Sequence, residues 1–222
     1  MTFITAIQLN DSIIVTADNK EVILKETNEV PLSQKQCQKI HPWDKGIITG
    51  TGESCVIGRA ITLFQEISQS ELVLLPHCLD LSRQIREYEI GTGYFQVENT
   101  KLLCSTYRED GAQLYKIERF DPLQPYTLVA IKPMDITVWL FHPDIDAIST
   151  NLQKLYVDLK DYSAFSNKTD WINYYINRLA PIYQKQSKHD QLMSQSFDIF
   201  FQTKDEFITG HVPNTHEGPL VF

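Results

Sequence analysis

Glycine is scarce in this sequence of 222 residues. Its nine glycines fall well below the ~7% share usual in globular proteins. Only a few positions in the chain can therefore allow a ligand or another strand to approach the backbone closely. Gly46, Gly50 and Gly52 form one cluster of such positions. Hydrophobic residues at 42% and charged residues at 22% match soluble globular chains, which excludes a collagen-like, low-complexity or wholly disordered protein.

Long basic runs, long apolar runs and a leader are also lacking. The net charge of -8 and the pI near 5.2 argue against a nucleic-acid or anionic-membrane surface, because both need clustered Lys and Arg. The longest apolar run, Leu72–Leu75, is far shorter than the ~20 residues that span a bilayer. The start at Met1–Thr5 has neither the basic nor the apolar region of a signal peptide. We expect a cytoplasmic protein that binds no nucleic acid and no membrane.

The four cysteines do not form a recognisable pattern. Cys37, Cys55, Cys78 and Cys104 lie far apart, with no CxxC pair and no nearby His at metal-ligand spacing. Buried, reduced thiols are the expected state. The sequence therefore predicts no disulfide framework, no metal site and no cofactor.

Short apolar and β-branched runs separated by turn residues predict antiparallel strands. They occur at Phe3–Leu9, Ser12–Thr16, Val22–Leu24, Gly46–Gly50, Lys101–Tyr107, Gln113–Arg119, Tyr126–Ile131, Phe197–Thr203 and Glu206–His211. The polar stretch Lys25–Gln38 contains Pro31 and is expected to be a loop. A sheet strand that begins almost at the first residue is unusual, since chain ends normally fray.

Helical spacing of apolar residues appears in four places. The first predicted helix has Ser54 as its N-cap candidate, and the second covers Pro76–Tyr88. The third begins near Asp144 or Asp146, and the fourth follows a cap at Ser166 or Thr169. The order is strands, two helices, strands, two helices, strands. Such clustering predicts an α+β fold with antiparallel sheets covered by helices rather than an alternating βαβ fold. We expect one domain over residues 1–211 and a polar tail over residues 212–222.

The start of the chain carries a candidate nucleophile. Removal of Met1 would leave Thr2 with a hydroxyl and an α-amine on one residue, so the amine could act as the base without a separate His. The amine has an ordinary pKa of ~7.7–8.0, close to neutrality. Thr is also a common second residue with no catalytic role, so position alone does not decide between the two interpretations.

Several segments carry a family resemblance. Thr2–Ile7 and Ile13–Asp18 resemble the first two strands of proteasome β-subunits and of the bacterial heat-shock peptidase HslV, in which a catalytic Thr begins the first strand and an Asp ends the second. Lys39-Ile40 falls where the family has Lys-Val, and Gly46–Gly52 resembles the next strand and its oxyanion turn. The hairpin within Leu102–Ile131 and the last hairpin, Phe197–Asp205, also resemble the family.

The resemblance implies a four-layer αββα sandwich of two antiparallel sheets flanked by helices, the proteasome-like fold of N-terminal nucleophile hydrolases. It also implies catalytic roles: Thr2 as nucleophile, Lys39 as the charge that lowers the pKa values at Thr2, and Asp18 as its partner. The backbone N–H of Gly50 would stabilise the oxyanion. Asp190 would support the Thr amine together with a serine that the spacing leaves open.

The open alternatives are Ser194 or Ser196 for that serine, a surface Asp18–Lys39 ion pair, and a turn glycine at Gly50. One segment departs from the family. Lys132–Asp135 occupies the place at which a Gly-Ser-Gly turn is expected, and Pro133 offers no N–H for such a turn. Lys132 or Asp135 could replace the turn by placing a charge near Thr2. The next run, Ile136–Phe141, is apolar and falls where the family begins a helix.

Two functions remain in view. The first is a threonine-type endopeptidase acting on peptides or unfolded proteins through an acyl-enzyme at Thr2. The second is an inactive proteasome-like scaffold that serves as a binding, regulatory or immunity subunit. Under either, the resemblance implies a homo-oligomer, and an ATP-dependent unfoldase is a further candidate partner.

Overall fold

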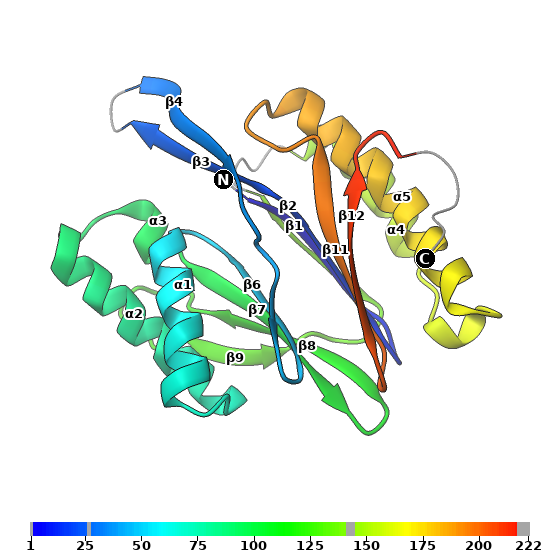
Figure 1. The fold of residues 1–222 in the computed structure, drawn as a ribbon, viewed down its shortest axis with the longest axis horizontal. Helices are drawn as coiled ribbons and strands as arrows, with labels where there is room; N and C mark the ends of the chain where they lie inside the picture. The colour runs from blue at the N-terminus through cyan, green and yellow to red at the C-terminus, as the bar shows by residue number, and fades with distance from the viewer. Residues whose placement is uncertain (1, 26–27, 141–144, 217–222) are drawn as a thin grey trace. The chain divides into compact units, whose positions relative to one another are not determined.

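A computed structural model describes residues 2–25, 28–140 and 145–216. The chain divides into two compact units (Figure 1). The first contains Met1–Ile40, Tyr107–Ala112 and Lys132–Phe222, and the second contains His41–Thr106 and Gln113–Ile131. The single-domain organisation expected from the sequence stays a prediction.

The first unit is built on a five-stranded antiparallel sheet in the order β10-β1-β2-β11-β12. The strands are β1 (Phe3–Gln8), β2 (Ile13–Asp18), β10 (Asp135–Leu140), β11 (Ser196–Gln202) and β12 (Phe207–Pro213). Every residue of β1 and β2 is buried, which accounts for their nearly continuous apolar sequence. These two strands are central in the sheet, so the start of the chain is held firmly.

Two helices pack on this sheet, α4 (Asp146–Val157) and α5 (Lys168–His189). Apolar side chains from both helices form one core with Phe3, Ile7 and Phe197 of the strands. The side chain of Asn167 accepts a hydrogen bond from the N–H of Asp170 and so caps the start of α5. The expected caps Ser166 and Thr169 flank that position without filling it.

The β1–β2 turn is tied to the short 3₁₀ helix Tyr162–Ala164. The Asp11 carboxylate accepts hydrogen bonds from the N–H groups of Tyr162 and Ser163 at 3.0 and 2.9 Å and from the Ser12 hydroxyl at 2.8 Å. Burial alone would raise the pKa of Asp11, but the hydrogen bonds from Ser163, Ser12 and Tyr162 outweigh it and hold the pKa below its ordinary value. Asp11 therefore anchors the segment between α4 and α5.

The stretch that the sequence marks as a loop is largely a strand. β3 (Lys20–Lys25) pairs antiparallel with β4 (Asn28–Gln36) in a separate two-stranded ribbon, so the loop expected over Lys25–Gln38 is wrong. The register shifts on either side of Leu24, which pairs with Pro31. An irregularity of this kind admits a proline within a ladder, because the proline lacks the N–H that a regular pair would use.

The second unit has a five-stranded sheet in the order β5-β6-β7-β8-β9. Its strands are β5 (His41–Trp43), β6 (Gly46–Thr51), β7 (Lys101–Arg108), β8 (Gly111–Glu118) and β9 (Thr127–Ala130), with the β7–β8 turn assigned to the first unit. Its helices are α1 (Ser54–Thr62), which continues into a π-helical segment, Leu63–Ile67, followed by α2 (Leu75–Ile90) and the short α3 (Phe95–Glu98). These elements enclose a second core around Phe64, Leu79 and Leu102.

The predicted α+β class with antiparallel sheets is confirmed, and so is the order of strands and helices. Glu53 rather than Ser54 caps α1, through its side chain and the N–H of Val56. Asp146 begins α4 as predicted, whereas Asp144 lies outside the described residues. Residues 217–222 of the expected polar tail lie outside them as well.

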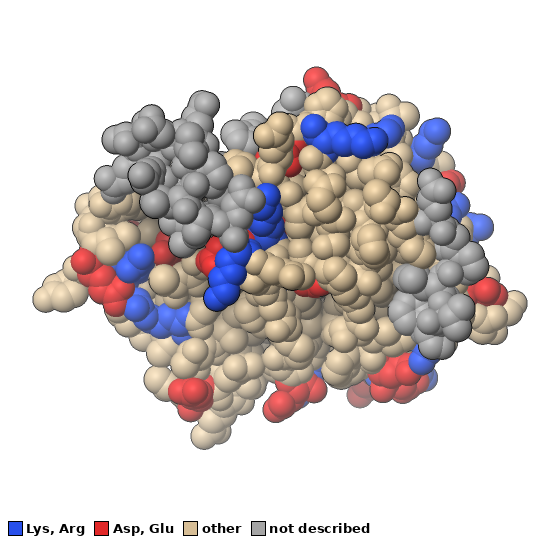
Figure 2. All heavy atoms as spheres, turned by 45° about the horizontal axis from the view of Figure 1, so that its top comes forward, with Lys and Arg blue, Asp and Glu red and all other residues tan. Residues whose placement is uncertain are grey.

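The cysteines only partly follow expectation. All four are free, and Cys78 and Cys104 are buried, but Cys55 is exposed at the start of α1 and Cys37 is half-buried. Among the described residues, three His, Cys, Asp or Glu side chains never gather closely enough to hold a metal ion. None of the described helices has the length and apolar character needed to cross a bilayer. On the face shown in Figure 2, the described Lys and Arg side chains are interspersed with Asp and Glu.

Candidate active site

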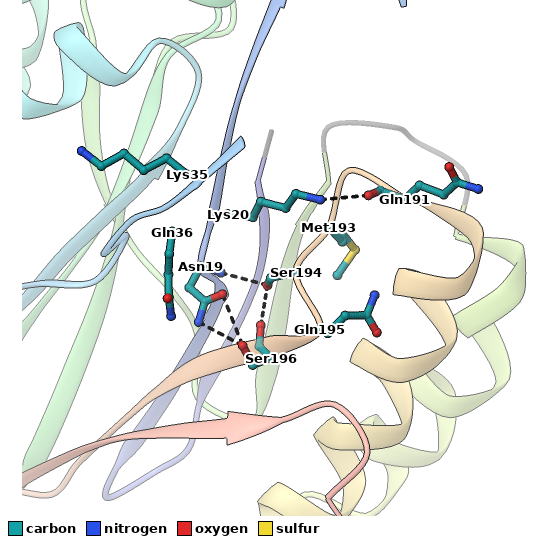
Figure 3. A pocket seen from close by; sticks show the side chains of 9 residues that line it. All are labelled: Asn19, Lys20, Lys35, Gln36, Gln191, Met193, Ser194, Gln195 and Ser196. Atoms are coloured by element: carbon teal, nitrogen blue, oxygen red, sulfur yellow. Dashed lines mark hydrogen bonds between the residues drawn. The ribbon is translucent and has the colours of Figure 1, made fainter. Parts of the chain in front are cut away.

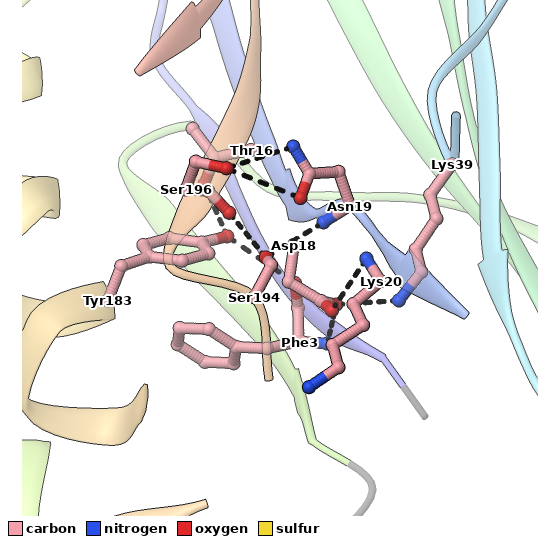
Figure 4. Close-up of polar contacts among 9 residues, drawn as sticks. All are labelled: Phe3, Thr16, Asp18, Asn19, Lys20, Lys39, Tyr183, Ser194 and Ser196. Carbon is pink, nitrogen blue, oxygen red and sulfur yellow. Dashed lines mark hydrogen bonds and ion pairs between the residues drawn. The ribbon is translucent and has the colours of Figure 1, made fainter. Parts of the chain in front are cut away.

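The centre of the candidate site is the carboxylate of Asp18 at the end of β2 (Figure 4). Its Oδ1 accepts a hydrogen bond from the N–H of Phe3 at 2.7 Å and one from the Lys39 ammonium at 2.8 Å. Its Oδ2 accepts a longer bond, 3.4 Å, from the N–H of Lys20. The Asp18 side chain is only 1% exposed and that of Lys39 is 10% exposed. The interpretation of this pair as a surface ion pair is therefore wrong.

Thr2 is half-buried and directly precedes Phe3, the first residue of β1. One carboxylate oxygen therefore binds both the backbone that follows Thr2 and the ammonium of Lys39. Buried charges are stable only when paired and hydrogen-bonded, and this pair is both. The structure thus brings three of the predicted residues, Thr2, Asp18 and Lys39, to one end of the first sheet.

Asn19 continues this polar cluster, although sequence reasoning does not identify it. The N–H of Asn19 donates to the Ser194 hydroxyl at 3.1 Å, and its side-chain amide bonds with the Ser196 hydroxyl at 3.2 Å. The Ser194 hydroxyl in turn donates to the carbonyl of Ser196. Both serines thus bind Asn19, by different groups, and the choice of serine that supports the Thr2 amine stays a prediction. An Asn after a strand is ordinary turn chemistry, so no specific signal marks it in the sequence.

Tyr183 supports the start of β1 from α5. Its hydroxyl donates to the Thr16 hydroxyl at 2.9 Å and lies 3.4 Å from the carbonyl of Phe3. Its ring stacks on Phe197 with centroids 4.2 Å apart. Complete burial raises the pKa of Tyr183, so the phenol stays a donor at neutral pH. Sequence reasoning identifies the helix but neither Tyr183 nor this polar contact.

Asp190 and Ser194 lie in the segment between α5 and β11. Asp190 ends α5, and its Oδ1 accepts a hydrogen bond from the N–H of Leu192 at 2.9 Å. The carboxylate therefore shapes the turn that leads to Ser194. The part predicted for Asp190 at the Thr2 amine stays a prediction.

Gly50 lies within β6 of the second unit, opposite Leu102 of β7. The interpretation as a turn glycine is therefore wrong. A Cβ added there would lie 2.7 Å from the carbonyl oxygen of Lys101 and 2.6 Å from the Leu102 side chain. Strand packing alone thus requires glycine at this position, and the oxyanion role stays a prediction.

The segment Lys132–Asp135, which departs from the family pattern, lies at the opposite end of the sheet from Thr2. This segment contains a turn in which Met134 has a φ of +59°, and β10 then begins at Asp135. Asp135 pairs with Gln8, whereas Leu140 pairs with Phe3. Five residues of strand at ~3.4 Å each separate Asp135 from the Thr2 end of β1. Asp135 therefore does not replace a charge near Thr2, and that expectation is wrong.

The apolar run Ile136–Phe141 falls where the family resemblance predicts the start of a helix, but Ile136–Leu140 is strand. Leu140, the last residue of β10, pairs with Phe3, and the next four residues, 141–144, lie outside the described residues. Trp139 of β10 is buried.

No family model and no curated protein matches the chain. Solved structures do match. Its fold is similar to that of the Anbu proteins. The Anbu complex of Pseudomonas aeruginosa gives a TM-score of 0.69 at 9% identity over 96% of this chain and 88% of that chain. A Gly-1 mutant of Anbu from Hyphomicrobium sp. strain MC1 gives 0.66 at 11% identity over 98% and 90%. Anbu, the ancestral beta-subunit, from Yersinia bercovieri gives 0.65 at 10% identity over 96% and 88%.

These matches confirm the predicted proteasome-like fold. They also correct the family expected from the sequence: the three matched structures named above are Anbu proteins, which are proteasome-like but distinct from proteasome β-subunits and HslV. The physical reason is that short motifs such as Thr2–Ile7 and Ile13–Asp18 describe strands that the whole fold shares. Such motifs indicate the fold but do not distinguish between the families that share it.

Proposed function

We propose that this chain is an N-terminal threonine hydrolase that cleaves peptide bonds, with Thr2 as the nucleophile after removal of Met1. The observation that carries the proposal is the buried Asp18 carboxylate, which binds the Phe3 N–H and the Lys39 ammonium through a single oxygen. A buried lysine and aspartate are costly to a fold, and titratable groups placed together at such a cost mark candidate functional sites.

The chemistry follows from the groups on Thr2 itself. The Thr2 hydroxyl attacks the carbonyl carbon of the peptide bond while its proton passes to the free α-amine. The C–N bond then breaks, the departing amine takes that proton, and an ester to Thr2 remains. Water attacks the ester and gives one proton to the α-amine, the C–O bond to Thr2 breaks, and the α-amine returns that proton to the Thr2 oxygen, which releases the carboxylic acid and restores the Thr2 hydroxyl. The α-amine can serve as base only when it is unprotonated.

Lys39 supplies the charge that this step needs. A positive charge close to an amine disfavours the protonated amine and lowers its pKa. A larger fraction of the α-amine is then unprotonated at neutral pH and can act as the base. Asp18 holds Lys39 charged and fixed, because the carboxylate is buried and already bound to the backbone of Phe3. Asp18 is thus a positioning residue, while Thr2 is the catalytic residue in this proposal.

The proposal extends to assembly. The Anbu complex of Pseudomonas aeruginosa forms a helical assembly, and we propose that this chain also self-associates. Peptides or unfolded proteins are the proposed substrates. The ATP-dependent unfoldase partner and the supporting roles of Gly50, Asp190 and Ser194 stay predictions.

The test is intact-mass measurement of the purified protein followed by incubation with an epoxyketone or β-lactone probe. The proposal expects loss of Met1 and one probe adduct, with neither adduct nor peptide hydrolysis in Thr2→Ala. Lys39→Met should slow adduct formation by at least ~10-fold, as loss of an activating group does. Lys154→Met, on the exposed side of α4, is the matched control and should react like the unmodified chain.

A retained Met1 without an adduct would overturn the proposal, because a blocked amine cannot act as base. That result would favour the binding scaffold, the other function that the sequence leaves open. Adduct formation at equal rates in Lys39→Met and Lys154→Met would refute the proposed role of the Asp18–Lys39 ion pair, but it would still support Thr2 as the nucleophile.

A further inference from the structure

An open cleft of about 340 Å³ lies beside the candidate site, entirely within the first unit (Figure 3). Three segments form its wall: Asn19 and Lys20 where β2 leads into β3, Lys35 and Gln36 at the end of β4, and Gln191 with Met193–Ser196 where α5 leads into β11. The cleft is at the small end of ligand sites, which commonly measure ~300–1,000 Å³. Eight of its nine described lining residues carry an amide, hydroxyl or ammonium group, and Met193 is the exception. Its chemistry suits a small polar group.

The charge of the cleft has one sign. Its described lining residues include two lysines and no Asp or Glu, in a chain whose net charge is -8. Glu21 lies opposite Lys35 in the β3–β4 register, so it offsets part of the Lys35 charge. Asp190 immediately precedes the lining segment, but its Oδ1 is engaged by the N–H of Leu192. Lys20 is therefore the principal cation of the cleft.

The contact that Lys20 makes leaves its charge uncompensated. Its ammonium donates to the backbone carbonyl of Gln191 at 3.0 Å, which is a neutral acceptor. An ammonium has three N–H donors and no acceptor, so this bond fixes the side chain across the cleft while two donors and the full charge remain. Figure 3 shows the Lys20 side chain reaching toward Gln191.

One wall of the cleft is rigid. Asn19 and Ser194 are both buried, and the N–H of Asn19 donates to the Ser194 hydroxyl. Ser196 binds the Asn19 side chain from the next strand. A ligand at this wall would therefore meet a preorganised surface, which reduces the ordering cost of binding. The exposed amides of Gln36, Gln191 and Gln195 can adjust to the ligand.

The cleft lies next to the Asp18–Lys39 ion pair of the candidate site. Asn19 follows Asp18 directly, and the N–H of Lys20 lies 3.4 Å from Asp18 Oδ2. Resting on the proposed function, we infer that this cleft binds a carboxylate of a peptide substrate or product, with Lys20 as its main ionic contact. The carboxylate can come from the free carboxy-terminus of the peptide or from an acidic side chain.

The experiment uses the full chain as Thr2→Ala, so that bound peptides are not turned over. Three probes are titrated and followed by the backbone amide signals of residues 19–20 and 191–196: N-acetyl-trialanine with a free carboxy-terminus, the same peptide amidated, and amidated N-acetyl-Ala-Asp-Ala. At least one carboxylate-bearing probe should bind about fivefold more tightly than the neutral one, the upper range for one exposed ion pair. The tighter of the two identifies the source of the carboxylate.

Lys20→Met should remove this preference, Lys20→Arg should retain most of it, and Lys154→Met on the exposed side of α4 should leave it unchanged. Equal dissociation constants for all three probes would overturn the inference, as would equal effects of Lys20→Met and Lys154→Met. A carboxylate preference without any Thr2 adduct would refute the proposed hydrolase activity and support the carboxylate-binding cleft. An adduct without a carboxylate preference would refute the binding cleft alone.

Discussion

Replacement of Asp18 by Asn isolates the charge of the buried ion pair. The substitution keeps an oxygen that can accept the hydrogen bond from the N–H of Phe3, now 2.7 Å from Asp18 Oδ1. It removes the negative charge that lies 2.8 Å from the Lys39 ammonium. Lys39 would then hold a positive charge in a site where its side chain is only 10% exposed.

The expected loss of stability follows from that burial. Breaking a buried ion pair by removing one partner typically costs ~3–5 kcal/mol, because the remaining charge is left uncompensated. The residual exposure of Lys39 lets water reach the ammonium, so we expect about 2–3 kcal/mol for Asp18→Asn. Lys39→Met should relieve that penalty, and the double variant should be more stable than the sum of the single changes by about 2 kcal/mol.

The assay is urea denaturation at pH 7 on the four members of this double-mutant cycle. The exposed pair Lys168–Glu206 is a matched control, with a 2.9 Å contact between side chains that are 39% and 47% exposed. Its cycle should give a coupling of about 0–1 kcal/mol. A coupling at Asp18–Lys39 no larger than that of the control would refute the reasoning that burial makes this pair costly to break.

Three further predictions concern stability. Asp11→Asn should cost about 0.5–1 kcal/mol at pH 7; because the folded pKa of Asp11 is lowered, that difference should persist above pH ~4 and vanish as the pH falls through the folded pKa in a pH series of urea titrations. Gly50→Ala should cost about 1–3 kcal/mol in thermal or urea unfolding, because its Cβ would meet a carbonyl oxygen of β7 at 2.7 Å. Tyr183→Phe should cost about 1–2 kcal/mol by loss of the hydrogen bond to Thr16, whereas Tyr88→Phe, at a side chain 94% exposed, should change stability by less than ~0.5 kcal/mol. Equal effects of the two tyrosine changes would contradict the assigned role of Tyr183.

The elements that the sequence predicts well are those whose burial leaves a periodic pattern. β1 and β2 are buried throughout, and their apolar runs end at turn residues, so the opening hairpin can be recognised. The helix α5 buries a regular stripe that includes Trp171 and Tyr183, and its spacing is equally visible. The pairing of Asp18 with Lys39 follows only from family spacing, because no local pattern joins residues 21 positions apart.

The misses have equally physical causes. β4 is polar and contains Pro31 next to a register shift, so it lacks the alternation that marks a strand. β10 reads as one apolar run, and periodicity over so few residues does not separate a strand from the start of a helix. Lys132–Asp135, where the Gly-Ser-Gly turn is expected, leads into β10 opposite Gln8, at the end of β1 farthest from Thr2. Register, which places Leu140 opposite Phe3, comes only from the paired backbone.

The most direct test of the account is the position of the covalent bond formed by the β-lactone or epoxyketone probe. Tandem mass spectrometry of the amino-terminal peptide from the probe-treated protein can assign the added mass to a single residue. The account predicts a peptide that begins at Thr2 and carries the probe on that residue. A peptide that still begins with Met1 and carries no probe, or an adduct on a different residue, would contradict it.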